Sequence, residues 1–370
     1  MPSKTITKTT IKENDIQLLL SCLSPVKNPQ TIQQIKTLSQ GDTDWATLIQ
    51  LAKKHKVGPL FYNQLSNLAI ETVPTSLQDA FRQYSQTMAG RNLFVTFELT
   101  RLLLLMAENG IDTLPYKGPV LAQTIYKTLS LRVFSDLDIV IQPQDIYAVE
   151  QLLIAEGYRP YYGKKSRTEL AAHMKSAAEH TYDFYHDSKQ VFIEVHWRFW
   201  PKTFSSVNPS HIWYRRQTAT VAGKTVSTLM IEDYLIILCM HGSRHVWQRL
   251  SWLCDIAILL HNYPDLDWQQ VMEQAHGWGV HRMLCLGLYL AHTWLNAPLP
   301  ESIIQQLAEP TLPALAAQVE YQAFQAGQHP KTFLATTQYQ LQVRERWQDK
   351  GAYMLSFIRW LLKGCPSTAD

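Results

Sequence analysis

The sequence predicts an α+β fold in which a mixed or antiparallel sheet in the middle of the chain is flanked by helical regions on both sides. Apolar residues recur at helical spacing before residue 111 and again from Ile231 onward, whereas between them the period changes to that of short strands. Hydrophobic residues make up 46% of the 370 residues, which is enough for a sizeable core. We therefore expect an N-terminal helical region (1–110), an α/β core (111–228) and a C-terminal helical region (229–370).

The N-terminal region has apolar positions at helical spacing. They lie in DIQLLLSCL, DWATLIQLAKKHKVGPLFYNQL and NLFVTFELTRLLLLMAENG. Asp44 is a suitable N-cap before Trp45, and Asn109-Gly110 closes the last of these helices. His55 lies in a short run of lysines, which indicates a solvated helix end.

The middle of the chain alternates short strands with short helices. Two apolar strands are separated by a helical segment, and two later segments with period-two alternation predict a β-hairpin across a DSKQ turn. The expected elements are a strand in 111–116, a helix in 118–129, a strand in 136–141, a helix from Pro143 to Gly157, hairpin strands in 180–186 and 191–197, and a short hairpin in AGKTVSTL.

The C-terminal region returns to helical spacing. Four amphipathic segments run from Ile231 to near Pro298, and residues 301–370 predict further helices.

Composition and charge exclude several classes of protein. The chain has 34 basic and 31 acidic residues, and the resulting net charge of +3 is no footprint of nucleic-acid binding. The five cysteines, Cys365 among them, are odd in number and form no C-x-x-C pair, which excludes a disulfide framework and a zinc knuckle and fits a reducing cytoplasm. No stretch approaches the roughly 18 apolar residues of a membrane span, so we expect a cytoplasmic protein without a membrane partner.

Three acidic residues in the middle of the chain predict a metal site. Asp136 and Asp138 lie two residues apart in a predicted strand, so both side chains leave the same face. Glu194 alternates with apolar residues in a later strand and can present a third carboxylate there. Such an oxygen-rich site suits Mg²⁺ and the two-metal chemistry of phosphoryl or nucleotidyl transfer. The alternative for a bare D-x-D is a turn or a solvated strand end.

A second group of residues suits phosphate binding. Lys117-Gly118 lies between a strand and a helix, where glycine permits close approach of the backbone to a ligand. Arg132 and Lys117 can neutralise phosphate charge. Ser135 precedes the acidic pair and can donate to a phosphate, although a serine that caps the strand entry explains it equally well.

The string LPYKGPVLAQTIYKTLSLRVFSDLDIVIQ resembles the core of the uncharacterised bacterial nucleotidyltransferase family, a branch of the DNA polymerase β-like nucleotidyltransferase superfamily. DWATLIQLAKKHKVGPLFYNQL upstream is similar to a flanking block of the same family, and so are IEVHWRF and EDYLIILCMHGSRHVWQRLSWLCDIAILL downstream. The resemblance covers about residues 44 to 300.

The resemblance implies a polymerase β-like core with Asp136, Asp138 and Glu194 as the catalytic metal triad. It implies Mg²⁺, or Mn²⁺, as cofactor and a nucleoside triphosphate such as ATP as substrate, with Lys117-Gly118 at the nucleotide-phosphate position. One feature departs from the wider superfamily, in which Gly-Ser opens that helix and the acidic pair follows about ten residues on. Here Pro119 follows Gly118 and the pair lies further away, so Lys117 takes the place of the serine contact.

Four further residues are candidates near the site or for the acceptor. His196 alternates with Glu194 and shares its face, as a metal or phosphate neighbour, a base or a satisfied histidine. His180 begins the preceding strand and can approach the same site or simply end the strand. His241 and Arg244 lie in a cluster of cations and aromatic residues that either holds an acceptor or packs helices together. Zinc binding there is rejected because no glutamate completes an H-E-x-x-H pattern.

The expected activity is transfer of an NMP from an NTP to a hydroxyl or similar acceptor, with release of pyrophosphate. A small molecule, a peptide or protein side chain, and tRNA all stay open as the acceptor, because fold and metal triad are shared across these chemistries. The alternatives are a toxin-like transferase that modifies tRNA or protein, and a nucleotide-binding module without turnover. No stable protein partner is expected.

Overall fold

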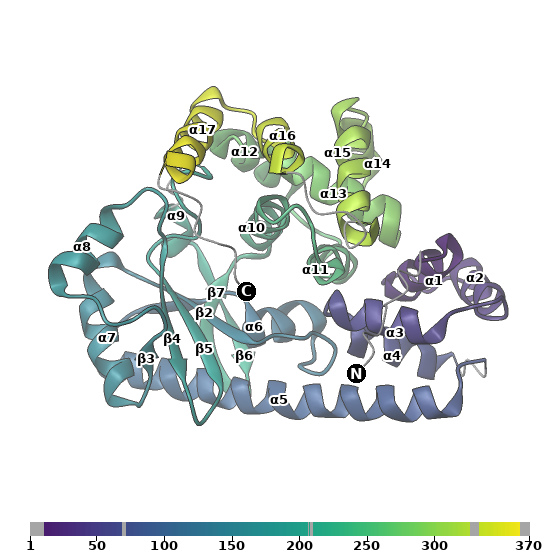
Figure 1. Cartoon of the computed structure of the whole chain (residues 1–370), viewed down its shortest axis with the longest axis horizontal. Helices are drawn as coiled ribbons and strands as arrows, with labels where there is room; N and C mark the ends of the chain where they lie inside the picture. Colours follow the sequence, from purple (N-terminus) through teal and green to yellow (C-terminus); the bar gives the residue numbers. More distant parts are fainter. Residues whose placement is uncertain (1–10, 69–71, 206, 208–209, 326–332, 363–370) are drawn as a thin grey trace, which may run out of the picture. The chain divides into compact units, whose positions relative to one another are not determined.

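A computed structural model describes residues 11–68, 72–205, 207, 210–325 and 333–362 of the chain (Figure 1). The cysteine at position 365 lies outside the described residues. The chain divides into two compact units, each assembled from separated segments. The first comprises Met1–Thr87, His241–Pro264 and Cys285–Tyr339, and the second comprises Met88–Met240, Asp265–Leu284 and Gln340–Asp370. The division into three consecutive regions stays a prediction.

The first unit is helical throughout its described part. Its helices are α1 (Glu13–Leu23), α2 (Pro29–Ser39), α3 (Trp45–Lys54), α4 (Gly58–Asn67), α11 (Leu250–Asn262), α14 (Glu301–Gln306), α15 (Thr311–Glu320) and the π-helical turn η3 (Tyr321–Gln325). Four helices have residues in both units: α5 (Thr75–Glu108), α10 (Ile231–Arg244), α13 (His281–Leu295) and α16 (Phe333–Val343). The predicted N-cap is confirmed, because Asp44 Oδ1 accepts the Thr47 N–H at 3.0 Å.

The interpretation of His55 as part of a solvated helix end is wrong. The side chain is fully buried, and its Nδ1 accepts the Leu250 N–H at 3.3 Å while its carbonyl oxygen accepts the Ser251 N–H at 3.3 Å. These are the first amides of α11, so His55 caps that helix from a distant part of the chain. Burial lowers the pKa of His55 to about 4.

The second unit is built around a five-stranded mixed sheet. Its strand order is β1 (Thr113–Pro115), β2 (Asp136–Ile141), β5 (Val191–His196), β4 (Thr181–His186) and β3 (Arg159–Pro160). β2 pairs with β5 in parallel and every other neighbouring pair is antiparallel. The predicted α+β class is therefore confirmed. β6 (Arg216–Val221) and β7 (Lys224–Leu229) form a separate antiparallel hairpin, also as expected.

Short helices connect and flank these strands. They are α6 (Gly118–Leu121), the π-helical turn η1 (Ala122–Tyr126), the 3-10 turn η2 (Pro143–Asp145), α7 (Ile146–Ala155), α8 (Arg167–Lys175), α9 (Ser210–Tyr214), α12 (Trp268–Trp278) and α17 (Trp347–Leu362). The helix predicted for 118–129 ends at Tyr126, because Lys127 adopts the left-handed conformation at φ 59°. β3 was not predicted, since two residues that include a proline carry no strand periodicity.

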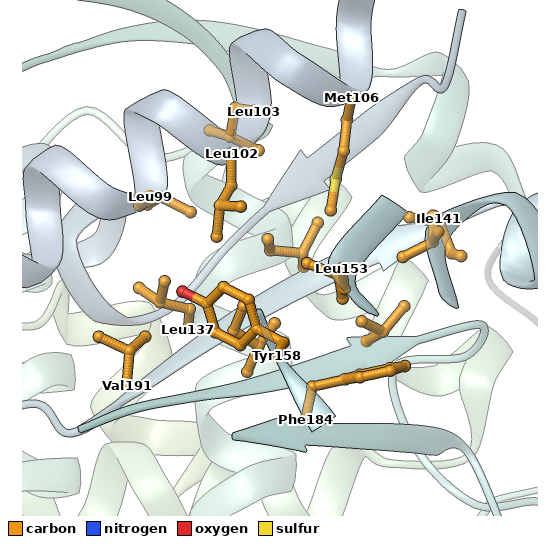
Figure 2. Packing of buried hydrophobic residues seen from close by; sticks show 14 of the residues in the cluster. Leu99, Leu102, Leu103, Met106, Leu137, Ile141, Leu153, Tyr158, Phe184 and Val191 are labelled. Carbon is orange, nitrogen blue, oxygen red and sulfur yellow. The ribbon is translucent and has the colours of Figure 1, made fainter. Parts of the chain in front are cut away.

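One face of the sheet is apolar and packs against helices. Leu137 on β2, Ile193 on β5 and Phe184 on β4 lie in one buried cluster with the inner face of α5 and with α7. Figure 2 shows Leu99, Leu102, Leu103 and Met106 of α5 above this cluster. In Figure 1 the later part of α5 lies along the sheet. Because side chains alternate between faces, residues 136, 138 and 194 point to the other side of the sheet.

A buried carboxylate joins α5 to the sheet. Glu98 is 6% exposed, and its Oε1 accepts from Arg101, Tyr158 and Lys189, each at 2.8 Å. Burial opposes its charge, but these three donors outweigh burial and lower the pKa of Glu98 to about 2.

Among the described residues, no helix combines the length and the apolar character needed to cross a membrane.

The Glu98→Gln variant is expected to lower the free energy of unfolding at pH 7 by about 3 kcal/mol, because three donors lose their charged acceptor. Since the folded pKa lies below the ordinary value of 4.5, this contribution is present above pH 4.5 and is lost as the pH falls towards 2. Urea unfolding across this range should therefore show a weaker pH dependence in Glu98→Gln than in the wild type. Glu108→Gln, at the exposed end of the same helix, is the matched control. If unfolding of the wild type and of Glu98→Gln had the same pH dependence, Glu98 would not be the ionised acceptor of these three donors.

Candidate active site

Two carboxylates from adjacent parallel strands meet on the face of the sheet opposite the apolar cluster. The pairing of β2 with β5 sets Asp138 opposite Glu194, so the two side chains leave the same face as neighbours. One oxygen of each carboxylate and one ring nitrogen of His196 lie within 4.8 Å of one another. The site residues predicted on separate strands are thus brought together.

Lys117 neutralises part of this charge. Its Nζ lies 2.8 Å from Asp138 Oδ1, with side-chain exposures of 15% and 2%. Burial opposes both charges, but their mutual attraction outweighs it: the pKa of Lys117 is raised and the pKa of Asp138 is lowered from their ordinary values. The ion pair thus holds the Lys117 ammonium inside the carboxylate cluster.

His196 occupies the centre of the cluster. Its Nε2 lies 3.1 Å from Asp138 Oδ1 and 3.4 Å from Glu194 Oε2. The imidazole ring makes T-shaped contacts with the rings of Tyr116 and His180, each with ring centroids 5.5 Å apart. Burial disfavours the charged ring, but the two carboxylates outweigh burial and raise the pKa of His196. His180 thus contacts the ring of His196 at the edge of the site.

Gly118 brings the start of α6 against the start of β2. Its φ is 54°, and a Cβ at this position would lie 2.9 Å from the carbonyl oxygen of Asp136. Both the left-handed conformation and the close approach require glycine. The Lys117-Gly118 pair is therefore held beside the acidic strand.

The remaining predicted residues lie along the segment that enters β2. Asp136 is half-buried, stands two residues before Asp138 on the same face, and is outside the group of three ligand atoms. Ser135 is exposed, and its N–H lies 3.4 Å from Asp136 Oδ1. Arg132 is 8% exposed, and its carbonyl oxygen accepts from the Asn92 side chain at 2.7 Å.

Asp183 is a further acidic residue that sequence reasoning missed. It pairs with Glu194 in the β4–β5 hairpin, which extends the row of acids across three strands. Burial and the nearby charge of Glu194 raise the pKa of Asp183. The sequence contained a signal for this position. The DSKQ turn sets His186 opposite Val191, and counting back along the two strands of the hairpin sets Asp183 opposite Glu194.

His241 and Arg244 belong to the first unit, whereas the carboxylates belong to the second. The ring of His241 contacts those of His245 and Trp252, with centroids 4.7 and 5.0 Å away, and the Arg249 guanidinium lies over Trp252 at 5.9 Å. The structure thus places His241 in an aromatic and cationic network within its own unit.

The donor set of the cluster fits a hard divalent cation. Carboxylate oxygens of Asp138 and Glu194 converge, and Asp136 stands on the same face of β2. Carboxylates on one sheet face repel each other unless cations lie between them, and Mg²⁺ prefers such oxygen ligands together with phosphate oxygens. The ammonium of Lys117 provides part of this positive charge. The geometry supports metal-assisted chemistry on a phosphorylated substrate.

A model of the family described as "Uncharacterised nucleotidyltransferase" matches residues 41–296, more than half of the chain. The match includes the whole carboxylate cluster, Lys117 and Gly118, and it confirms the resemblance noted in the sequence. Comparisons of the chain with curated proteins and with solved structures gave no match.

Gly118→Ala is expected to lower the free energy of unfolding by about 2 kcal/mol, because alanine is strained at positive φ and its Cβ would press on the Asp136 carbonyl. Gly110→Ala is the matched control, because Gly110 also has positive φ, at 71°, but a Cβ there meets nothing within 4 Å. The measurement is urea unfolding of both variants. If both variants lost the same free energy of unfolding, the close approach to the Asp136 carbonyl would contribute nothing to the cost of Gly118→Ala.

Proposed function

Because the chain belongs to the uncharacterised nucleotidyltransferase family, we propose that it transfers a nucleoside monophosphate from a nucleoside triphosphate to an acceptor hydroxyl, with release of pyrophosphate. Membership makes it an enzyme that transfers a phosphorus-containing group. Beyond family membership, we propose a nucleoside triphosphate as the substrate, dependence on a divalent metal ion, and a polymerase β-like core.

One observation carries the proposal. The parallel pairing of β2 with β5 puts Asp138 beside Glu194, and Lys117 reaches the same carboxylate at 2.8 Å. The proposed metal ligands and the proposed cation for the phosphate groups thus lie next to one another. In-line displacement at phosphorus requires both in one site.

Asp136, Asp138 and Glu194 would hold Mg²⁺ or Mn²⁺. When bound, the metal would supply positive charge to the attacking and leaving oxygens. Glu194 is more accessible than Asp138, with a side chain 30% exposed against 2%, so it is better placed to meet an incoming acceptor.

The chemical step conserves charge and atoms. The acceptor oxygen forms a bond to the α-phosphorus, and the bond from that phosphorus to the bridging oxygen of the β-phosphate breaks. Glu194 takes the proton of the acceptor hydroxyl, and pyrophosphate leaves.

Lys117 and the Gly118 backbone are the proposed contacts to the triphosphate. The missing side chain of Gly118 leaves its amide open to close approach, and Lys117 keeps its positive charge in the cluster. Arg132 and Ser135 remain proposed contacts to further phosphate oxygens, because both lie in the segment that leads into β2. ATP is the proposed nucleotide and the cytoplasm the proposed location.

Incorporation of label from each of four α-³²P nucleoside triphosphates, with Mg²⁺ or Mn²⁺, tests the proposal in a mixture of small molecules, RNA and protein. Wild type should label one fraction, and Asp136→Asn and Asp138→Asn should each reduce labelling at least about 100-fold, because each removes a proposed metal ligand. Asp187→Asn is the matched control, since Asp187 lies in the exposed turn between β4 and β5.

The labelled fraction identifies the acceptor class. Label in RNA or protein would favour the toxin-like transferase, and label in the small-molecule fraction would favour a metabolite or natural product. Nucleotide binding without label, unchanged in both aspartate variants, would replace the proposal by a binding module without turnover.

A further inference from the structure

His196 is a deeply buried polar side chain of the carboxylate cluster. It is 1% exposed, and its Nε2 is the atom that faces both Asp138 and Glu194. The two distances, 3.1 and 3.4 Å, are compatible with two roles: a metal ligand, or a hydrogen-bond donor that fixes the ligands. The two roles require opposite states of Nε2, because a ligand nitrogen offers a lone pair and a donor nitrogen carries a proton.

The surroundings of the second ring nitrogen, Nδ1, favour the hydrogen-bond donor over the metal ligand. Nδ1 of His196 is buried and meets no hydrogen-bond partner among the residues that the structure describes. A histidine that binds a metal through one nitrogen normally donates the N–H of the other to a carboxylate, a carbonyl or water. A neutral ring whose single proton is on Nδ1 would leave a buried donor unsatisfied and would turn the Nε2 lone pair towards two carboxylates, and both effects are unfavourable. The Nε2-protonated ring avoids the second of these effects, because its Nε2–H faces both carboxylates.

We propose that His196 is a positioning residue whose Nε2–H donates to Asp138 Oδ1 and Glu194 Oε2, and that it holds these two carboxylates at metal-binding separation without itself coordinating the metal. This inference rests on the proposed function, because it takes Asp138 and Glu194 as metal ligands.

The surroundings of the ring keep it in this role. Tyr116 and His180 make T-shaped contacts with the ring, and the backbone of His196 is paired on both sides, with Val140 of β2 and with Thr181 of β4. The imidazole therefore stands at a fixed place between the two strands that supply the carboxylates.

His196 also explains how Lys117 can serve two purposes. Lys117 and His196 contact the same oxygen, Asp138 Oδ1, at 2.8 and 3.1 Å. When the ammonium of Lys117 engages a triphosphate, His196 keeps a donor on that oxygen, so the orientation of Asp138 does not depend on Lys117 alone.

Pulsed EPR of Mn²⁺ bound to the full-length protein tests the inference without any turnover. A directly coordinated imidazole gives a ¹⁴N coupling, so we expect the wild-type spectrum to lack one. A ¹⁴N coupling in wild type that disappears in His196→Gln would make His196 a ligand and overturn the inference, while leaving the proposed function intact.

Mn²⁺ titration of three variants tests the positioning role. His196→Gln keeps an N–H near the place of Nε2 and should bind Mn²⁺ within about threefold of wild type, whereas His196→Asn and His196→Leu should bind at least about tenfold more weakly. His261→Gln, at the exposed end of α11, is the matched control, and circular dichroism verifies that each variant is folded. Equal weakening in the Gln and Leu variants would overturn the inference. A wild type that binds no Mn²⁺ with or without nucleotide would remove the proposed function, and the inference with it.

Discussion

The parallel pairing of β2 with β5 is the constraint on which the candidate site depends. The register that sets Leu137 opposite Ile193 in the core also sets Asp138 opposite Glu194 on the other face. A shift of one residue would turn the acidic side chains of one strand into the apolar core and its apolar side chains onto the polar face, so the hydrophobic packing of α5 and α7 specifies the register. The free energy that holds the site together thus comes from the opposite face of the sheet.

Burial and charge oppose each other in this site. Desolvation disfavours the charges on Lys117, Asp138 and His196, yet their pKa values move in the direction that keeps opposite charges paired. The buried Asp138 carboxylate has both Lys117 and His196 within hydrogen-bond distance, which compensates for its loss of solvent. A metal ion would meet an Asp138 carboxylate whose pKa the neighbouring cations already lower.

The sequence was most informative where periodicity and local turns decide the structure. The bounds of β2 agree with the strand expected at 136–141, and the hairpin that carries Glu194 and His196 follows from alternation around a short turn. It was least informative where a residue meets a partner far away in the chain. His55 caps α11 across 195 residues, and the Glu98 to Lys189 ion pair spans 91 residues. No local pattern distinguishes such residues from solvated ones, because their burial depends on packing between distant segments.

The long segment between Gly118 and Asp136 shows how tertiary contacts compensate for an unusual spacing. Asn92 of α5 is 1% exposed, and its side-chain amide donates to the carbonyl oxygens of Leu129 and Arg132 at 2.6 and 2.7 Å. These bonds satisfy buried acceptors in a segment that has no regular structure, and they fix its path back to β2. The start of α6 then lies against the first residue of β2, at the Gly118 to Asp136 contact. Lys117-Gly118 and the acidic pair are separated in sequence. They lie side by side because α5 anchors the connection between them.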